Sequence, residues 1–191
     1  MRLSIENDTV SSAGRAAHDV GLAAMLGGNL FGRLAMNPAL GRVSDPSERG
    51  EVVNAAWRRY GTVNSLGLAA VLAGWYGARA TETRPRYLTD RERSLAKAKD
   101  VTVGVVALTG VAAAIEGVRF ARDCPDGAVP LADGATPSAD TPPGAARRKR
   151  VLNALSAASI ASEVALWGIN AAMAQANFRR PAKRRVLKRT W

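Results

Sequence analysis

Residues 151–178 read VLNALSAASIASEVALWGINAAMAQANF, an alanine-rich segment whose only charged side chain is Glu163. Its polar side chains recur every seven residues, at Ser156, Glu163, Asn170 and Asn177. Seven residues make about two turns of an α-helix, so these four side chains share one helical face. The segment therefore predicts a helix whose polar face is covered by other helices.

Residues 101–122 repeat this pattern in a second alanine- and valine-rich segment. Its polar side chains, Thr102, Thr109 and Glu116, are again seven residues apart. Each of the two helices would thus bring one carboxylate, Glu116 or Glu163, into the interior of a helical bundle. A carboxylate at membrane depth is costly and either pairs with another group or serves an ion or proton path.

Composition limits the class of protein. The 191 residues suffice for one domain with a sizeable core, and no strand-like alternation stands out. Hydrophobic residues make up 47% of the chain but aromatic residues only 5%, so small apolar side chains must fill the core. Cys124 is the only cysteine, which excludes an internal disulfide, and the first residues lack the pattern of a removable signal peptide.

We expect an all-α, four-helix up-down bundle that crosses a membrane, with helices at about 15–40, 57–79, 93–122 and 149–178. The segment 57–79 is the clearest candidate, because no charge lies between Arg59 and Arg79 and about 20 apolar residues cross a bilayer. Aromatic residues bracket it as two interfacial belts would. These are Trp57, Tyr60, Trp75 and Tyr76.

The connections differ in character. Ser44, Asp45 and Pro46 predict a turn that leads into a helix, and Thr89 is placed to cap the third helix. Residues 123–146 are dense in Pro, Gly, Asp, Ser and Thr, so we expect a flexible, solvent-facing loop.

Rows of small residues predict where helices touch, since they let backbones approach closely. The rows are Gly28 with Gly32, then Ser65, Ala69, Ala73 and Gly77, and finally Ala113 with Gly117.

The candidate polar residues inside the bundle are Glu116, Glu163, Arg33, Asn29 and His18. Glu163 is expected to pair with Arg33 or bond to Asn29, and Glu116 to pair with Arg119 one turn away. This structural interpretation is favoured over proton transport. His18 is the only histidine, and a lone histidine is more often structural than a metal ligand, so no metal or cofactor is predicted.

No catalytic residues are predicted. The chain has no GxSxG, GxGxxG, GxxxxGK, HExxH or CxxC motif, which weighs against a soluble hydrolase, kinase or zinc enzyme. Proton transfer or quinone chemistry within a membrane stays open.

The C-terminal tail carries the strongest charge feature in a chain of net charge +11. Its basic residues are Arg179, Arg180, Lys183, Arg184, Arg185, Lys188 and Arg189. Such a cluster after an apolar helix is typical of an anchor on anionic phospholipid at the cytoplasmic surface. Nucleic acid is the alternative partner, although only Trp191 is at hand for base stacking.

The stretches GGNLFGRLAMNPAL (27–40) and ERGEVVNAAWRRYGTVNSLGLAAVLAGW (48–75) resemble the first half of small four-helix membrane proteins of the anthrone-oxygenase-like kind. The resemblance implies a helix, a proline-containing link and an Arg- and Tyr-rich helix start. The second half of the chain offers no matching motif. Neither an activity nor site residues are carried over.

These patterns together predict a small integral membrane protein with both termini cytoplasmic and Cys124 in an unshielded external loop. We expect a non-enzymatic structural or accessory subunit that packs with other helices, or with a second copy, and binds anionic lipid. One alternative is a proton-coupled transporter or membrane oxidoreductase subunit that uses Glu116 and Glu163. The other is a soluble alanine-rich bundle that binds nucleic acid or protein, which a mean hydropathy near zero keeps open.

Overall fold

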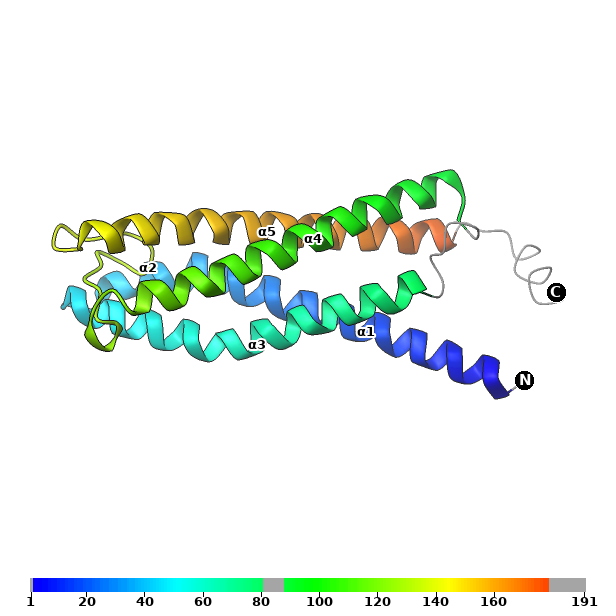
Figure 1. Ribbon diagram of the computed structural model, residues 1–191, viewed down its shortest axis with the longest axis horizontal. Helices are drawn as coiled ribbons and strands as arrows, with labels where there is room; N and C mark the ends of the chain where they lie inside the picture. Colours follow the sequence, from blue (N-terminus) through cyan, green and yellow to red (C-terminus); the bar gives the residue numbers. More distant parts are fainter. Residues whose placement is uncertain (1, 81–87, 179–191) are drawn as a thin grey trace.

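The computed structural model describes the backbone of residues 2–80 and 88–178, and the side chains of 12–80 and 88–176. Within these residues four long helices make up the fold: α1 (Arg2–Phe31), α3 (Pro46–Ala80), α4 (Asp90–Ala121) and α5 (Pro143–Phe178). In Figure 1, α1 lies along α3 and α4 along α5, with successive helices running in opposite directions. The expected all-α class with four helices is confirmed.

The helices begin earlier than their apolar segments. We expected starts near 15, 57, 93 and 149, whereas the helices begin at Arg2, Pro46, Asp90 and Pro143. The reason is that polar residues do not end a helix, while capping groups and a proline in the first turn set its start. At α3, the Asp45 carboxylate accepts hydrogen bonds from the Ser47 and Glu48 amides at 2.6 and 3.1 Å.

Thr89 caps α4 as the sequence predicted. Its hydroxyl accepts from the Glu92 amide, while the Glu92 carboxylate accepts from the Thr89 amide at 2.8 Å, which completes a capping box. This reciprocal pair satisfies two donors that the first turn of a helix otherwise leaves free.

The end of α1 is not a regular helix. A π-helical turn (η1, Gly32–Met36) is followed by the short α2 (Asn37–Ala39) and the 3-10 turn η2 (Leu40–Arg42). Pro38 has no amide to donate and its ring would crowd the carbonyl of Leu34 in a straight helix. A widened turn at this point accommodates the proline.

Glycines bring α1 and α3 into backbone contact. A Cβ at Gly21 would lie 2.6 Å from the Gly67 carbonyl oxygen, and a Cβ at Gly74 would lie 2.5 Å from that of Gly14. Gly14 and Gly21 are one heptad apart on α1, as are Gly67 and Gly74 on α3. The contact therefore repeats every two turns along the pair.

The predicted row of Ser65, Ala69, Ala73 and Gly77 is on the other side of α3, where all four residues are exposed. The row is therefore not buried against another helix of the described chain, and its packing with other helices stays a prediction. The i, i+4 spacing marks a face, but two faces of α3 carry small residues and only the one with glycines permits backbone contact.

Two of the aromatic residues expected at a membrane interface also pack inside the α1–α3 pair. The Tyr60 ring lies against Gly28, and its hydroxyl is 2.9 Å from the carbonyl oxygens of Ala24 and Met25. Trp57 lies over Gly32 and meets the Tyr60 ring edge-on, with the ring centres 5.7 Å apart. Because Gly28 and Gly32 have no side chain, they leave the space that these two aromatic rings occupy.

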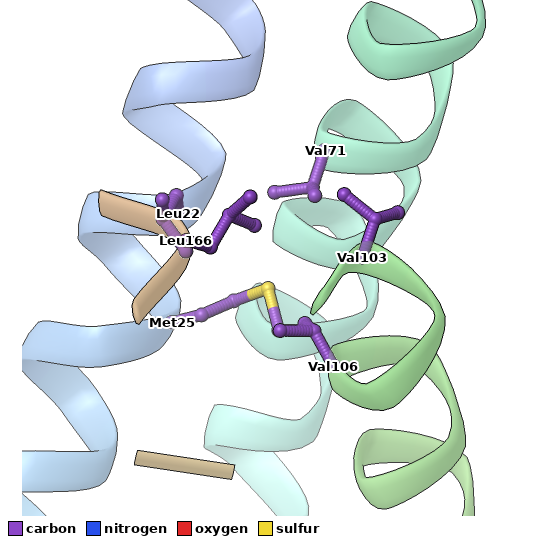
Figure 2. Packing of buried hydrophobic residues seen from close by; sticks show 6 residues of the cluster. All are labelled: Leu22, Met25, Val71, Val103, Val106 and Leu166. Carbon is purple, nitrogen blue, oxygen red and sulfur yellow. The ribbon is translucent and has the colours of Figure 1, made fainter. Parts of the chain in front are cut away.

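All four helices contribute to a central apolar cluster. Figure 2 shows its side chains converging from the four helices. They are Leu22, Met25, Val71, Val103, Val106 and Leu166. A second, loop-end cluster lies where α1 joins α3 and α4 joins α5, and comprises Leu40, Val53, Phe120, Val129, Leu131 and Ala145.

The connection between α4 and α5 is folded onto the bundle, contrary to the expected solvent-facing loop. Val129 and Leu131 are fully buried, and Gly50 on α3 lies directly against the backbone of Val129. The Arg49 guanidinium donates to the carbonyl of Leu131 at 3.0 Å. The connection packs onto the bundle through these two apolar side chains, which lie among Pro and Gly residues. It also contains the short turn η4 (Pro125–Gly127).

Two helices, α4 and α5, are long and apolar enough to cross a membrane by length and composition. The segment 57–79, the clearest candidate from the sequence, does not meet that measure. No charge lies between Arg59 and Arg79, but the Asn, Ser, Thr, Tyr and Gly residues in between keep the segment from being strongly apolar. An uncharged segment is therefore not the same as an apolar one.

Candidate functional site

Glu163 is buried at the centre of the bundle, with 1% of its surface exposed. One carboxylate oxygen, Oε1, accepts a hydrogen bond from Asn29 Nδ2 at 2.9 Å, and Oε2 has no hydrogen-bond partner among the described residues. Arg33, the other partner considered from the sequence, donates instead to the carbonyl of Asn153 at 3.3 Å. The carboxylate is thus held by an amide and not by a cation.

A cavity of about 1430 Å³ runs from the loop-end cluster to Glu163 between the two helix pairs. Its polar lining includes Asn29, Tyr60, Asn64, Ser156, Ser159 and Glu163. The amide oxygen Oδ1 of Asn64 is buried and, like Glu163 Oε2, has no partner in the part of the chain that is described. Buried polar atoms are normally hydrogen-bonded, so these two acceptors indicate a site that water or a ligand fills.

Lys149 lines the other end of the same cavity with 5% of its surface exposed. Its ammonium nitrogen lies 5.2 Å from the centre of the Phe120 ring, and no carboxylate within the described residues is close enough to form an ion pair with it.

Lys149 and Glu163 belong to one stripe of α5. Lys149, Ser156 and Glu163 follow one another at seven-residue intervals, and all three line the cavity. The charged ends of the stripe are about 21 Å apart along the helix axis. The cavity therefore has a cation at the loop end and a carboxyl group at its deep end.

Glu116 is separate from this cavity. Its carboxylate forms ion pairs with Arg119 at 2.7 Å and Arg148 at 3.4 Å, and Arg148 also reaches Asp123 at 3.2 Å. The expected pairing with Arg119 is present, and Arg148 is an additional partner. The structure does not bring Glu116 and Glu163 together.

His18 lies on the far side of the central apolar cluster. It is 2% exposed, and its Nδ1 is 2.8 Å from the carbonyl oxygen of Val71. Next to it, the Asp19 carboxylate accepts from the Asn170 amide at 3.1 Å. In the described part of the chain, no group of three His, Cys, Asp or Glu residues could hold a metal ion. His18 thus links α1 to α3.

The seven basic residues predicted to bind lipid, from Arg179 to Arg189, lie outside the described residues, as does Asn177 as a side chain. Cys124 is half-buried and packs against the loop-end cluster, so the expected unshielded thiol is not present. Thr102 and Thr109 donate to carbonyls of their own helix, at Ala98 and Val105.

The sequence interpretation missed Lys149 and Asn64. Lys149 stands in the run Arg147–Arg148–Lys149–Arg150, which has the appearance of a solvated charge run. The available signal was the seven-residue stripe itself, because one further step back from Ser156 reaches Lys149. Asn64 belonged to no repeated pattern.

Comparison with known proteins gives no family assignment. No family model matches the chain, and neither a curated protein nor a solved structure does. The resemblance to anthrone-oxygenase-like proteins therefore receives no support from a family model. The function has to be argued from the helices and the cavity.

Proposed function

We propose that this chain is a small multi-pass membrane protein that acts as a non-enzymatic structural or accessory subunit, packing with other helices and with anionic lipid. The observation that carries the proposal is the outer face of α4. Of the two candidate spans in the described residues this helix has the more apolar segment, yet only 11% of that segment is buried inside the structure. The corresponding share for α5 is 22%.

The exposed apolar side chains of α4 extend over most of its length. They are Val101, Val105, Leu108, Val111, Ile115 and Val118, with Leu108 73% exposed. An apolar helix in a water-soluble bundle faces the core, whereas a continuous apolar outer face marks contact with lipid or with another protein. This argues against the soluble alternative that binds nucleic acid.

Partner helices would find a second surface on α3. The exposed row of Ser65, Ala69, Ala73 and Gly77 has the small-residue spacing that permits close packing in lipid. Because α3 uses its glycine face against α1, we infer that a helix from another subunit or a second copy of the chain would pack at Ser65, Ala69 and Ala73 of this row.

The positions of the carboxylates give less support to a transporter or oxidoreductase that uses both of them. Glu116 is neutralised by two arginines, and it does not line the cavity that reaches Glu163. A relay through both groups would need a connection that the helices do not provide.

Alkaline carbonate extraction tests the membrane location. After cell fractionation, the full chain should stay in the carbonate-washed pellet and be released by detergent, because apolar helices remain in the bilayer when peripheral contacts are broken. Recovery of the chain in the carbonate supernatant would overturn the proposal.

The proposed orientation has both termini in the cytoplasm and the connection between α4 and α5 outside, on the positive-inside rule. Since Cys124 is half-buried, the test uses Cys124→Ser as background and adds Ala139→Cys, at an exposed position of that connection. A membrane-impermeant maleimide should label this variant in intact cells. The matched control, Arg91→Cys at the opposite end of α4, should label only after lysis; the reverse pattern would invert the orientation.

A further inference from the structure

We propose that the cavity between the helix pairs binds a phosphate-bearing amphiphile, with its anionic head at Lys149 and its hydrocarbon chain in the groove between α3 and α4. The inference rests on the proposed membrane location for its source of ligand. It concerns a cavity lined by residues of the described helices and their connections, whereas the basic tail lies outside the described residues.

Lys149 lies at the end of the cavity where the anionic head group would bind. A lysine that is 95% buried, faces a cavity and has no carboxylate partner among the described residues is an energetically costly arrangement that a bound anion would relieve. Arg58 and Arg122 line the same end of the cavity, and none of the ion pairs within the described residues involves either of them. Asp126 is the acidic residue in the lining at this end.

Small residues of α3 and α4 line the part of the cavity where the hydrocarbon chain would lie. Gly61 on α3 and Gly110 and Ala113 on α4 line the cavity and leave the space between the helices open. Leu66 and Val118 also line it, and they are 68% and 51% exposed on the outer surface. Residues that face both the cavity and the outside mark a lateral opening, through which a chain would pass into the surrounding lipid.

The volume favours an amphiphile over a small polar ligand. Pockets for small molecules measure about 300–1,000 Å³, and this cavity, at about 1430 Å³, is larger. It has room for a head group with part of a chain. The unpartnered oxygens of Glu163 and Asn64 lie at the deep end, where water that accompanies the ligand would supply hydrogen bonds.

The test measures lipid binding to the purified full chain in neutral detergent by native mass spectrometry. The probes are phosphatidylglycerol, phosphatidylcholine and glycerol 3-phosphate, which separate the anionic lipid from a zwitterionic lipid and from a head group without chains. We expect the tightest binding for phosphatidylglycerol. Equal binding of phosphatidylcholine would overturn the role of the anion, and equal binding of glycerol 3-phosphate would overturn the role of the chain.

Two pairs of variants locate the site. Lys149→Gln should weaken the tightest phosphatidylglycerol site about tenfold, since a charge-assisted contact is lost, while Lys97→Gln, at an exposed position outside the cavity, should not. Gly110→Leu should also weaken binding by filling the groove, where a Cβ would meet only Leu68 at 3.8 Å. Its control is Gly104→Leu on the same helix, in open space and outside the cavity lining.

The thermal midpoint of each variant separates site loss from misfolding. Glycine-to-leucine changes within a helix raise helix propensity, so Gly110→Leu should fold and lose the lipid. Unchanged phosphatidylglycerol binding in both Lys149→Gln and Gly110→Leu would overturn the proposal and assign the bound lipid to the tail. Because these measurements are made in detergent, their failure is distinct from failure of the carbonate extraction.

Discussion

The two helix pairs are built by different means. In the α1–α3 pair, glycines let the backbones touch and aromatic rings pack against two further glycines, so the helices approach closely. The α4–α5 pair is joined by longer side chains, including the Glu116–Arg148 ion pair and the contact of Lys149 with Phe120. It turns an apolar face outward.

The difference has a physical reason. Where small residues allow close approach, dispersion contacts between backbones hold a pair together in any solvent. Larger side chains keep neighbouring helices further apart. The cavity that contains Lys149 and Glu163 lies between the two helix pairs. The α1–α3 pair thus packs backbone against backbone, whereas the α4–α5 pair provides the outer apolar surface and the charged stripe.

The largest expected effect comes from placing a charge on the outer face of α4. On the proposed membrane location, Leu108→Asp should abolish stable membrane accumulation, since an aspartate at the centre of a spanning helix costs about 2.5–3.5 kcal/mol. Ala98→Asp, an exposed position of the same helix beside Lys97, is the control and should accumulate normally. Quantitative immunoblots of membrane fractions measure both. Equal accumulation of the two variants would mean that α4 does not face lipid.

The glycine contact gives the next largest effect. Gly21→Ala places a methyl group 2.6 Å from the Gly67 carbonyl oxygen and should lower the free energy of unfolding by about 1–3 kcal/mol. At Gly27, on the same helix, a Cβ meets nothing within 4 Å, so Gly27→Ala should raise stability by about 0.5–1 kcal/mol. Thermal unfolding in detergent distinguishes them. A stabilised Gly21→Ala variant would contradict the close approach of α1 and α3.

Substitutions of Glu163 test how much its hydrogen bond to Asn29, which joins α5 to α1, contributes to stability. Glu163→Gln keeps an oxygen that can accept from Asn29 and should change stability by less than about 1 kcal/mol, whereas Glu163→Leu leaves the Asn29 amide unpaired and should cost about 1–2 kcal/mol. Unfolding curves in the same detergent measure both. A Gln variant that folds normally but loses a proton-dependent activity would favour the transporter alternative.

Parts of this arrangement were predictable from local patterns. The seven-residue spacing on α5 placed Glu163 inside, and Asn29 was one of two partners inferred for it. The capping group of α4 followed from Thr89 and the acidic first turn. These features depend on the period of the helix and on residues within one turn of each other, which is information that the sequence holds locally.

Other parts were not predictable in this way. Two faces of α3 carry small residues, and nothing in the spacing favoured Gly67 and Gly74 over Ala69 and Ala73. The connection after α4 had the composition of a flexible loop, yet Val129 and Leu131 are buried because Gly50 gives their backbone a place to lie. Each of these outcomes depends on which surface of a helix far away in the sequence faces the residues in question.

The sequence by itself determined that the described chain is helical, where α4 is capped, and which face of α5 points inward, because helix period and capping are set by neighbours in the chain. Only the tertiary structure decided that Glu116 is held by two arginines while Glu163 faces a cavity, and that Lys149 shares that cavity. The reason is that the partner of a buried charge is fixed by how helices far apart in sequence pack against one another, which no local pattern records.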